Sequence, residues 1–446
     1  MKNILRNIAF LLLTVTSIFV TKSCVVAPKP FTGLAPGEWR VILQLEDKSK
    51  PLNNKSARLD ADPYTKIEEV SKGELPFTFE VIYETKEKFY LNIINGEEKI
   101  RVDDIRIGRS KRSQHDTFWI NLPVYGSYLR GEFQCNVMQG KWVVPSKENY
   151  EIPFVARHGQ NHRFTSMLRT PMTDISGKWA VVFGTDAEPK ENAIGEFVQK
   201  GNHVSGTFLT ETGDYRYLDG TIQGEKLYLS CFDGAHAFLF EAKISEDSTM
   251  IGSFRSGHKY KTIWTAKKDN NAQLRNANSI TKVTGKSDLN FSFANPEGKQ
   301  ISLQNADYQG KVKLVQVMGT WCPNCKDESN FLAEYIKNNA SKAVTAVGLS
   351  FERSKDIALA NQKLAAYKKE MNIPYELVLA GAADKKEASK VLPMIDEVSA
   401  FPTLLIVDKK NKIRRIHTGF SGPATSEYAA FKAEFDTFVN ELINEK

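Results

Sequence analysis

The chain has 446 residues, 41% hydrophobic and 25% charged, a composition typical of a folded protein that excludes a disordered or collagen-like chain. At roughly 100–200 residues per domain, this length suggests about three domains. The 60 Lys and Arg residues outnumber the 53 Asp and Glu residues and give a net charge of +7, but no dense basic segment occurs, so the sequence does not support nucleic-acid binding.

The N-terminus has the pattern of a targeting segment. Lys2 and Arg6 precede residues 8–20, an uncharged run that is too short to span a bilayer comfortably and fits the core of a signal peptide. The segment resembles a Bacteroidetes-type lipoprotein signal. That resemblance implies removal of residues 1–23 and lipid modification of Cys24. An ordinary secreted protein with a stray cysteine and a permanent anchor helix are the alternatives.

The same segment predicts the compartment of the mature chain. A lipoprotein or secreted protein lies outside the cytoplasm, where disulfides persist. Residues 24–36 are rich in Pro and small residues, so we expect a lipid-anchored tether that holds the protein at a membrane of the cell envelope, facing the periplasm. Loss of residues 1–23 removes three positive charges and leaves a net charge of +4.

Residues 37–266 have the pattern of antiparallel all-β structure. Alternating, aromatic-rich runs are separated by turn signals such as Asn95-Gly96, and sustained helical periodicity is hard to find. The runs are 77–83, 89–94, 118–122, 129–137, 195–199, 204–209, 226–231 and 237–242.

This β region looks duplicated. A Gly-x-Trp motif opens each unit, at Gly37-Glu38-Trp39 and at Gly177-Lys178-Trp179. We therefore predict one β-domain at residues 37–170 and a second, a repeat of the first, at 171–266. The motif resembles the opening of lipocalin-like and avidin-like barrels, but core tryptophans alone would explain it. The sequence leaves open whether the units are closed barrels or sandwiches.

The pattern changes after a polar segment at residues 267–286, which we interpret as a linker. From residue 287 to 446, strand-like runs alternate with helix-like runs, which predicts an α/β domain. The predicted strands are 313–318, 343–350, 375–379 and 403–407, and the predicted helices are 325–338, 355–371 and 385–392.

A Cys-x-x-Cys motif, Trp321-Cys322-Pro323-Asn324-Cys325, lies between the first of these strands and the first helix. Free backbone N–H groups and the helix dipole stabilise a thiolate at a helix N-terminus. We therefore predict that Cys322 is the exposed, attacking cysteine and that Cys325 is the more buried, resolving cysteine. A structural zinc site would need two further ligands, and a static disulfide would close too small a loop to stabilise much.

The residues from 287 onward resemble a known family in several motifs. The WCPNC motif, the Glu three residues after it and the segment AFPTLLIVDKKNKI match the thioredoxin-like domain of TlpA/ResA-type thiol-disulfide reductases, which overlap the AhpC/TSA group. This resemblance implies a thioredoxin-like fold, a redox pair at Cys322 and Cys325, and a cis peptide bond at Pro402 beside that pair.

The resemblance also implies roles for further residues. Glu328 matches the acidic residue that tunes the cysteine pKa values in these reductases; the alternative is a solvated glutamate of the first helical turn. Ser329 stands where many relatives have a helix-kinking proline, and the buried aspartate of cytoplasmic thioredoxins is absent. The residues that we expect to contact the client protein are Trp321, Pro323, Phe401 and Pro402.

The remaining cysteines, Cys135 and Cys231, lie in strand-like runs of different β-units. We interpret both as buried free thiols; a disulfide between them is the less favoured alternative. The histidines are scattered, so we expect no metal site.

These observations favour a membrane-tethered extracytoplasmic thiol-disulfide oxidoreductase. It would reduce disulfides in client proteins and need a membrane electron donor for its own reduction, with no cofactor. Alternatively, the β-units are the working part and bind a glycan, lipid or protein partner, with the α/β domain as an accessory redox sensor. In a third possibility, the β-units recruit clients for the oxidoreductase.

Overall fold

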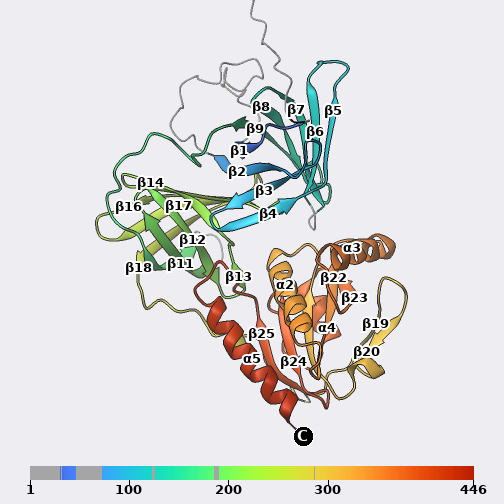
Figure 1. Cartoon of the computed structure of the whole chain (residues 1–446). Helices are drawn as coiled ribbons and strands as arrows, with labels where there is room; N and C mark the ends of the chain where they lie inside the picture. The colour runs from blue at the N-terminus through green and yellow to red at the C-terminus, as the bar shows by residue number, and fades with distance from the viewer. Residues whose placement is uncertain are drawn as a thin grey trace, which may run out of the picture.

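The computed structural model describes residues 31, 33–46, 73–122, 126–184, 190–285 and 287–445. The predicted signal segment and Cys24 lie outside these residues. Two antiparallel β-domains are followed by an α/β domain (Figure 1). The predicted fold class is confirmed.

The first β-domain is an open, curled sheet. Its nine strands are antiparallel in the order β4-β3-β2-β1-β9-β8-β7-β6-β5, and within the described residues no pairing joins β4 to β5. The strands are β1 (Gly37–Gln44), β2 (Glu74–Tyr83), β3 (Phe89–Asn95), β4 (Glu98–Val102), β5 (Ile105–Arg109), β6 (Asp116–Leu122), β7 (Ser127–Gln134), β8 (Val137–Val143) and β9 (Glu151–His158).

The second β-domain is a closed barrel. β18 pairs with β10, and β11 pairs with both β10 and β12, which closes a ring of eight strands with the short β13 outside it. The strands are β10 (Gly177–Phe183), β11 (Glu191–Lys200), β12 (His203–Thr210), β13 (Gly213–Asp214), β14 (Leu218–Gln223), β15 (Lys226–Phe232), β16 (Ala237–Ile244), β17 (Thr249–Ser256) and β18 (Tyr260–Lys268).

Aromatic side chains fill the barrel interior. Phe208 on β12 stacks on Phe240 of β16 with ring centroids 4.5 Å apart and meets Trp264 of β18 at 5.2 Å. These strands are not hydrogen-bonded neighbours, so the rings meet across the interior. The interior is therefore a packed core in its aromatic part.

The Gly-x-Trp motifs occupy equivalent places in the two β-domains. The indole of Trp39 donates a hydrogen bond to the carbonyl of Ala35 (2.9 Å), and the indole of Trp179 donates to that of Ile175 (2.8 Å), in each case four residues earlier. Both tryptophans are buried. The two openings thus share one local structure, and both tryptophans belong to hydrophobic cores.

The two β-domains also share a hydrophobic core through β15. Leu227, Leu229 and Cys231 belong to the barrel core, whereas the alternate residue Phe232 belongs to the core of the first domain. There its ring stacks on Phe77 with centroids 4.2 Å apart. The two-residue period of a strand explains how one strand serves two cores. The β-domains therefore pack as one unit.

The α/β domain has a mixed sheet in the order β23-β22-β21-β24-β25. Helices α2, α3 and α5 pack on one face, and α4 with a small hairpin packs on the other. The elements are β19 (Ser292–Ala294), β20 (Gln300–Ser302), η3 (Ala306–Tyr308), β21 (Val312–Met318), α2 (Pro323–Asn338), β22 (Val344–Glu352), α3 (Ile357–Glu370), β23 (Glu376–Ala382), α4 (Lys385–Val391), β24 (Thr403–Val407), β25 (Ile413–Thr418) and α5 (Tyr428–Asn444).

The polar segment before this domain packs against it. It contains the short helix η2 (Ala277–Ser279), and Asn278 lies 3.0 Å from Nδ1 of His417 on β25. The buried Thr281 hydroxyl accepts a hydrogen bond from Thr418 (2.8 Å). This segment thus adds to the packing of β25. Among the described residues, no helix is long and apolar enough to cross a membrane.

Candidate active site

The dithiol motif lies where β21 ends and α2 begins. All seven residues of β21 are buried, which fixes the end of the strand inside the domain. Pro323 occupies the first turn of α2, where a missing N–H costs nothing. Cys322 caps the helix, and its sulfur accepts a hydrogen bond from the Cys325 N–H at 3.2 Å. The helix N-terminus therefore stabilises negative charge on Cys322.

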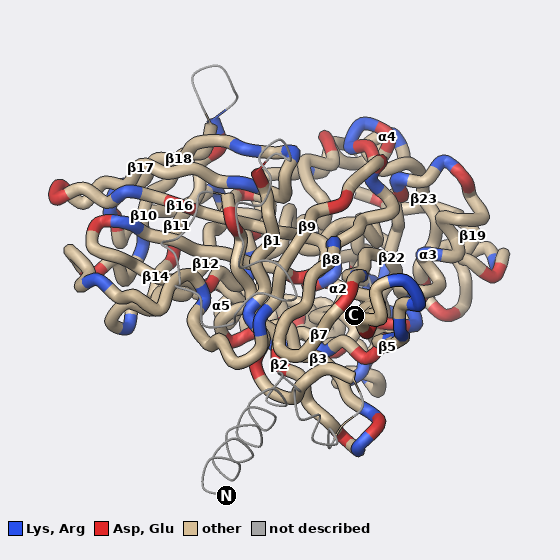
Figure 2. Tube along the Cα trace, turned by 90° about the horizontal axis from the view of Figure 1, so that it is seen from above, with Lys and Arg blue, Asp and Glu red and all other residues tan. Residues whose placement is uncertain are grey.

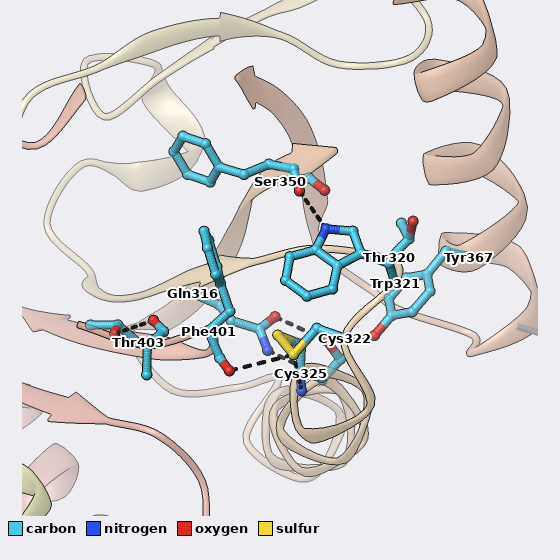
Figure 3. The surroundings of a disulfide bond; sticks show 12 residues. Gln316, Thr320, Trp321, Cys322, Cys325, Ser350, Tyr367, Phe401 and Thr403 are labelled. Atoms are coloured by element: carbon cyan, nitrogen blue, oxygen red, sulfur yellow. Dashed lines mark hydrogen bonds between the residues drawn. A yellow bond between two sulfur atoms is a disulfide. The ribbon is translucent and has the colours of Figure 1, made fainter. Parts of the chain in front are cut away.

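Cys322 and Cys325 form a disulfide, with their Cα atoms 5.2 Å apart (Figure 3). Cys325 is fully buried and Cys322 is only 5% exposed. The predicted order of exposure is found, but Cys322 is much less open than the sequence suggested. The peptide bond between Phe401 and Pro402 is cis, and the Phe401 carbonyl oxygen lies 3.5 Å from Cys322 Sγ.

Trp321 leans against the segment that contains this cis bond. Its indole donates a hydrogen bond to the Phe351 carbonyl (2.8 Å), and its ring meets Phe401 edge to face at 5.5 Å. Trp321 and Phe401 are both half-buried. The structure thus brings Trp321, Phe401 and the buried Pro402 together around Cys322.

A buried carboxylate holds the loop before the dithiol. Glu352, at the end of β22, accepts hydrogen bonds from the N–H and hydroxyl of Thr320, each at 2.8 Å, and from the Ser350 hydroxyl at 2.6 Å. These three donors satisfy the carboxylate in place of water. Glu352 therefore positions residues 320–321. Sequence reasoning missed it, because no local pattern marks it.

Glu328 is fully buried on α2, one turn after Cys325 and on the same side of the helix. Burial raises its pKa to about 8, with the Gln316 side chain opposing part of this increase. Neither oxygen makes a hydrogen bond of normal geometry to the described residues. The side chain is therefore not a solvated first-turn glutamate. A carboxyl with this pKa exchanges protons near neutral pH.

Gln316 occupies the middle of the central strand beneath the dithiol. It donates a hydrogen bond to the Cys325 carbonyl (3.1 Å) and accepts one from the Ser329 hydroxyl (2.9 Å). Ser329 in turn accepts from the Tyr367 hydroxyl (3.2 Å). Ser329, which stands where many similar reductases have a helix-kinking proline, is thus part of a buried chain of hydrogen bonds.

A loop of the barrel covers one side of the active-site helix. A Cβ atom on Gly213 would lie 1.8 Å from the Asn324 side-chain nitrogen, so any other residue there would displace the Asn324 side chain. Next to it, the Asp214 carboxylate accepts a hydrogen bond from the Gly422 N–H (2.6 Å). Burial, and then the neighbouring Asp327 charge, raise the pKa of Asp214 to about 6.

Arg216 joins the three folded parts at this point. Its guanidinium contacts Glu98 of the first β-domain (2.5 Å), Asp233 of the barrel (3.1 Å) and Asp327 of α2 (2.5 Å). Its side chain is only 5% exposed. The ion pairs therefore fix the barrel against the active-site helix. Their partners are far apart in sequence, so sequence reasoning missed Arg216.

The other two cysteines differ from each other. Cys231 is a buried free thiol whose pKa burial raises, as expected of an inert cysteine. The expectation of burial is wrong for Cys135, which is exposed at a two-residue turn between β7 and β8. The predicted run at 129–137 covers parts of two strands, β7 and β8. The sequence did not reveal the turn between them, because the alternating pattern continues through it. No group of metal-ligating side chains occurs within the described ranges.

The fold and the dithiol define a thioredoxin-like thiol-disulfide oxidoreductase domain. The AhpC/TSA family matches residues 284–416. The thiol-disulfide oxidoreductase ResA of Bacillus subtilis is 28% identical over 149 residues, which are 33% of this chain and 74% of ResA. The thiol:disulfide interchange protein DsbE of Escherichia coli is 27% identical over 27% of this chain and 56% of its own length.

Among solved structures, the thioredoxin-family thiol:disulfide interchange protein from Chlorobium tepidum is similar over 36% of this chain and 99% of its own, with 21% identity and a TM-score of 0.28. The C-terminal part of the chain is thus similar in sequence to the thiol-disulfide oxidoreductases ResA and DsbE and to the AhpC/TSA family. These comparisons cover about a third of the chain and do not extend over the β-domains.

Proposed function

We propose that the protein reduces disulfides in client proteins outside the cytoplasm, as a membrane-tethered enzyme. The observation that carries this proposal is the buried dithiol at the N-terminus of α2, with the Phe401 carbonyl beside Cys322 and the high-pKa carboxyl of Glu328 beside Cys325. These groups supply a stabilised thiolate, a backbone position for an extended client and a proton acceptor for the resolving thiol.

The reaction has two exchange steps. The Cys322 thiolate attacks one sulfur of the client disulfide and forms a mixed disulfide, and the released client thiolate takes a proton from solvent. Cys325 passes its proton to Glu328 and attacks Cys322, which releases the second client sulfur as a thiolate. This thiolate takes a proton from solvent, and Glu328 returns its proton to solvent. The client gains two electrons and the enzyme ends with the Cys322–Cys325 disulfide. A membrane-bound dithiol donor would return two electrons and reset the cycle.

The tether rests on the sequence of the N-terminal segment. The signal-like run and Cys24 favour a lipid anchor facing the periplasm, and a redox site needs a compartment in which client disulfides persist. Labelling the protein with a radioactive fatty acid, with Cys24→Ala as the control, tests the anchor. We expect incorporation into the parent protein alone. Equal labelling of both proteins contradicts it.

Activity is tested by insulin reduction with the parent protein and two variants. We expect Cys322→Ser to abolish turnover and Cys325→Ser to stop after the first exchange, as a covalent enzyme–client adduct that is visible on a non-reducing gel. Trapping by Cys325→Ser in cell-envelope extract would then identify the client. Turnover that persists in Cys322→Ser would contradict the mechanism. A reduction potential as high as that of strong oxidants would overturn the reductive direction.

A further inference from the structure

Three cationic side chains, one from each folded part, lie over two aromatic rings, Tyr150 and Trp321. Lys147 lies in the loop between β8 and β9 of the first β-domain, Lys259 lies in the turn between β17 and β18 of the barrel, and Arg353 follows β22 in the thioredoxin-like domain. Lys259 and Arg353 are exposed, and Lys147 is half-buried.

Two aromatic rings hold these cations in place. The Nζ atoms of Lys147 and Lys259 lie 4.6 and 5.7 Å from the centroid of the Tyr150 ring. The Cζ atom of Arg353 lies 4.5 Å from the centroid of the Trp321 ring. Trp321 directly precedes Cys322 in the chain. Burial, together with the neighbouring charges of Arg353 and Lys259, lowers the pKa of Lys147. Arg353 and Lys259 are thus both close enough for their charges to act on Lys147.

No carboxylate of the described residues forms an ion pair with any of the three. Glu352 is next to Arg353, but its oxygens accept hydrogen bonds from Thr320 and Ser350. Lys259 contacts Glu148 only at its backbone carbonyl, at 3.4 Å. Over the part of the chain that the structure describes, Lys and Arg are interspersed with Asp and Glu (Figure 2). The Glu352 charge acts on Arg353 and offsets part of the repulsion among the cations, whereas neither lysine forms an ion pair with a described carboxylate. An anion brought from outside relieves the remaining repulsion.

We propose that Lys147, Lys259 and Arg353 form a recognition surface for an acidic segment of the client protein next to its disulfide. This inference rests on the proposed function and names the class of client. Arg353 places a guanidinium, a group suited to binding carboxylates, over the Trp321 ring, and the two lysines add positive charge over Tyr150. A client with Asp or Glu residues near its cysteines is attracted to this side of Cys322. Opposite charges raise the association rate most at low ionic strength.

The surface also gives the β-domains a part in the reaction. Two of the three cations come from the β-domains, and the contacts of Arg216 hold these domains against α2. Client choice is thus a property of the whole chain, while the exchange chemistry belongs to Cys322 and Cys325.

The test uses the full-length reduced protein and two disulfide peptides that differ only in flanking residues, four Glu in one and four Lys in the other. The test variant replaces Lys147, Lys259 and Arg353 with Gln. The control variant replaces Lys111, Lys243 and Lys299, three exposed lysines elsewhere, with Gln. Each rate is divided by the rate of the same protein on the neutral disulfide of mercaptoethanol. This ratio separates client recognition from exchange chemistry.

We expect the parent protein and the control variant to prefer the acidic peptide by about tenfold or more in kcat/KM at low salt. The preference should fall at least fivefold in the test variant, and it should weaken in the parent protein as salt increases. An unchanged preference in the test variant, or none in the parent protein, overturns the proposal.

Failure of the reductase function itself has a different signature, namely no Cys322-dependent turnover of the neutral disulfide. Recognition is then measured directly by fluorescence anisotropy, with the acidic peptide carrying Ser in place of both cysteines. Tighter binding to the parent protein than to the test variant supports the surface, and equal binding overturns it.

Discussion

Replacing Glu328 with Gln should remove a pH dependence of folding stability. In the folded protein the pKa of Glu328 is about 8, against an ordinary value of 4.5, because the carboxyl is buried. Below pH 4.5 the group is protonated in both the folded and the unfolded chain, so its titration costs no stability. As pH rises, the unfolded chain ionises first, so the native state loses stability until the pH exceeds the folded pKa.

The size of this loss follows from the two pKa values. Each pKa unit corresponds to about 1.4 kcal/mol. The titration of Glu328 therefore lowers the free energy of unfolding by about 5 kcal/mol as the pH rises from below 4.5 to above 8. Gln does not titrate, and every other ionisable group is common to both proteins. The stability difference between Glu328→Gln and the parent should therefore shift by several kcal/mol in favour of the variant between pH 5 and pH 9.

The measurement is urea unfolding of the oxidised proteins at several pH values, since the intact disulfide keeps Cys322 and Cys325 from titrating. Glu334→Gln is the matched control, because Glu334 lies on the same helix and is exposed. Its curve should run parallel to that of the parent protein. If the free energy of unfolding of Glu328→Gln also changes with pH in parallel with that of the parent protein, burial does not raise the pKa of Glu328.

The same substitution should slow the second exchange step. At pH 7 a carboxyl with a pKa of about 8 is mostly protonated, so the ionised fraction that accepts the Cys325 proton rises as pH approaches 8. A base in this place contributes at least about 100-fold to a proton transfer. In stopped-flow experiments, Glu328→Gln should accumulate the mixed disulfide and lose the inflection near pH 8. Unchanged kinetics would exclude Glu328 as the base.

Three further predictions follow from the contacts. In the native oxidised protein, a maleimide should modify the exposed Cys135 rapidly and Cys231 only after unfolding; fast reaction of both would contradict the burial of Cys231. Arg216→Ala leaves buried carboxylates without their cation and should cost about 3–5 kcal/mol in urea unfolding, whereas a loss below 1 kcal/mol would mean that the ion pairs are weak. Gly213→Val should lower client turnover, because its side chain overlaps Asn324.

Much of the fold could be predicted because the residue pattern within each segment indicates its secondary structure. The two-residue alternation in β1 and β2 and the change to strand–helix alternation after residue 287 both follow from which side chains face a core. The dithiol could be predicted for the same reason, since a strand, two cysteines and a helix adjoin in sequence. The turn at Cys135 could not be predicted in this way, because the alternation of polar and apolar residues continues through it.

The burial of Glu328 and the position of Arg216 could not be predicted from local pattern. A glutamate in the first turns of a helix is usually solvated, and only the packing of Gln316 beneath α2 reveals that this one is not. Arg216 contacts residues more than a hundred positions away in both directions. Such ion pairs depend on how the domains dock. The residue pattern of a single helix or strand carries no information about that docking.

Charged side chains of the β-domains occur in two different settings near the thioredoxin-like domain. At Arg216, buried carboxylates satisfy the cation, which gives a fixed contact against α2. On the proposed recognition surface, Lys147, Lys259 and Arg353 form no ion pair with the described residues, so we expect their charge to be available to a client. Since Cys322 is only 5% exposed, a client must be held closely to present its sulfur for in-line attack.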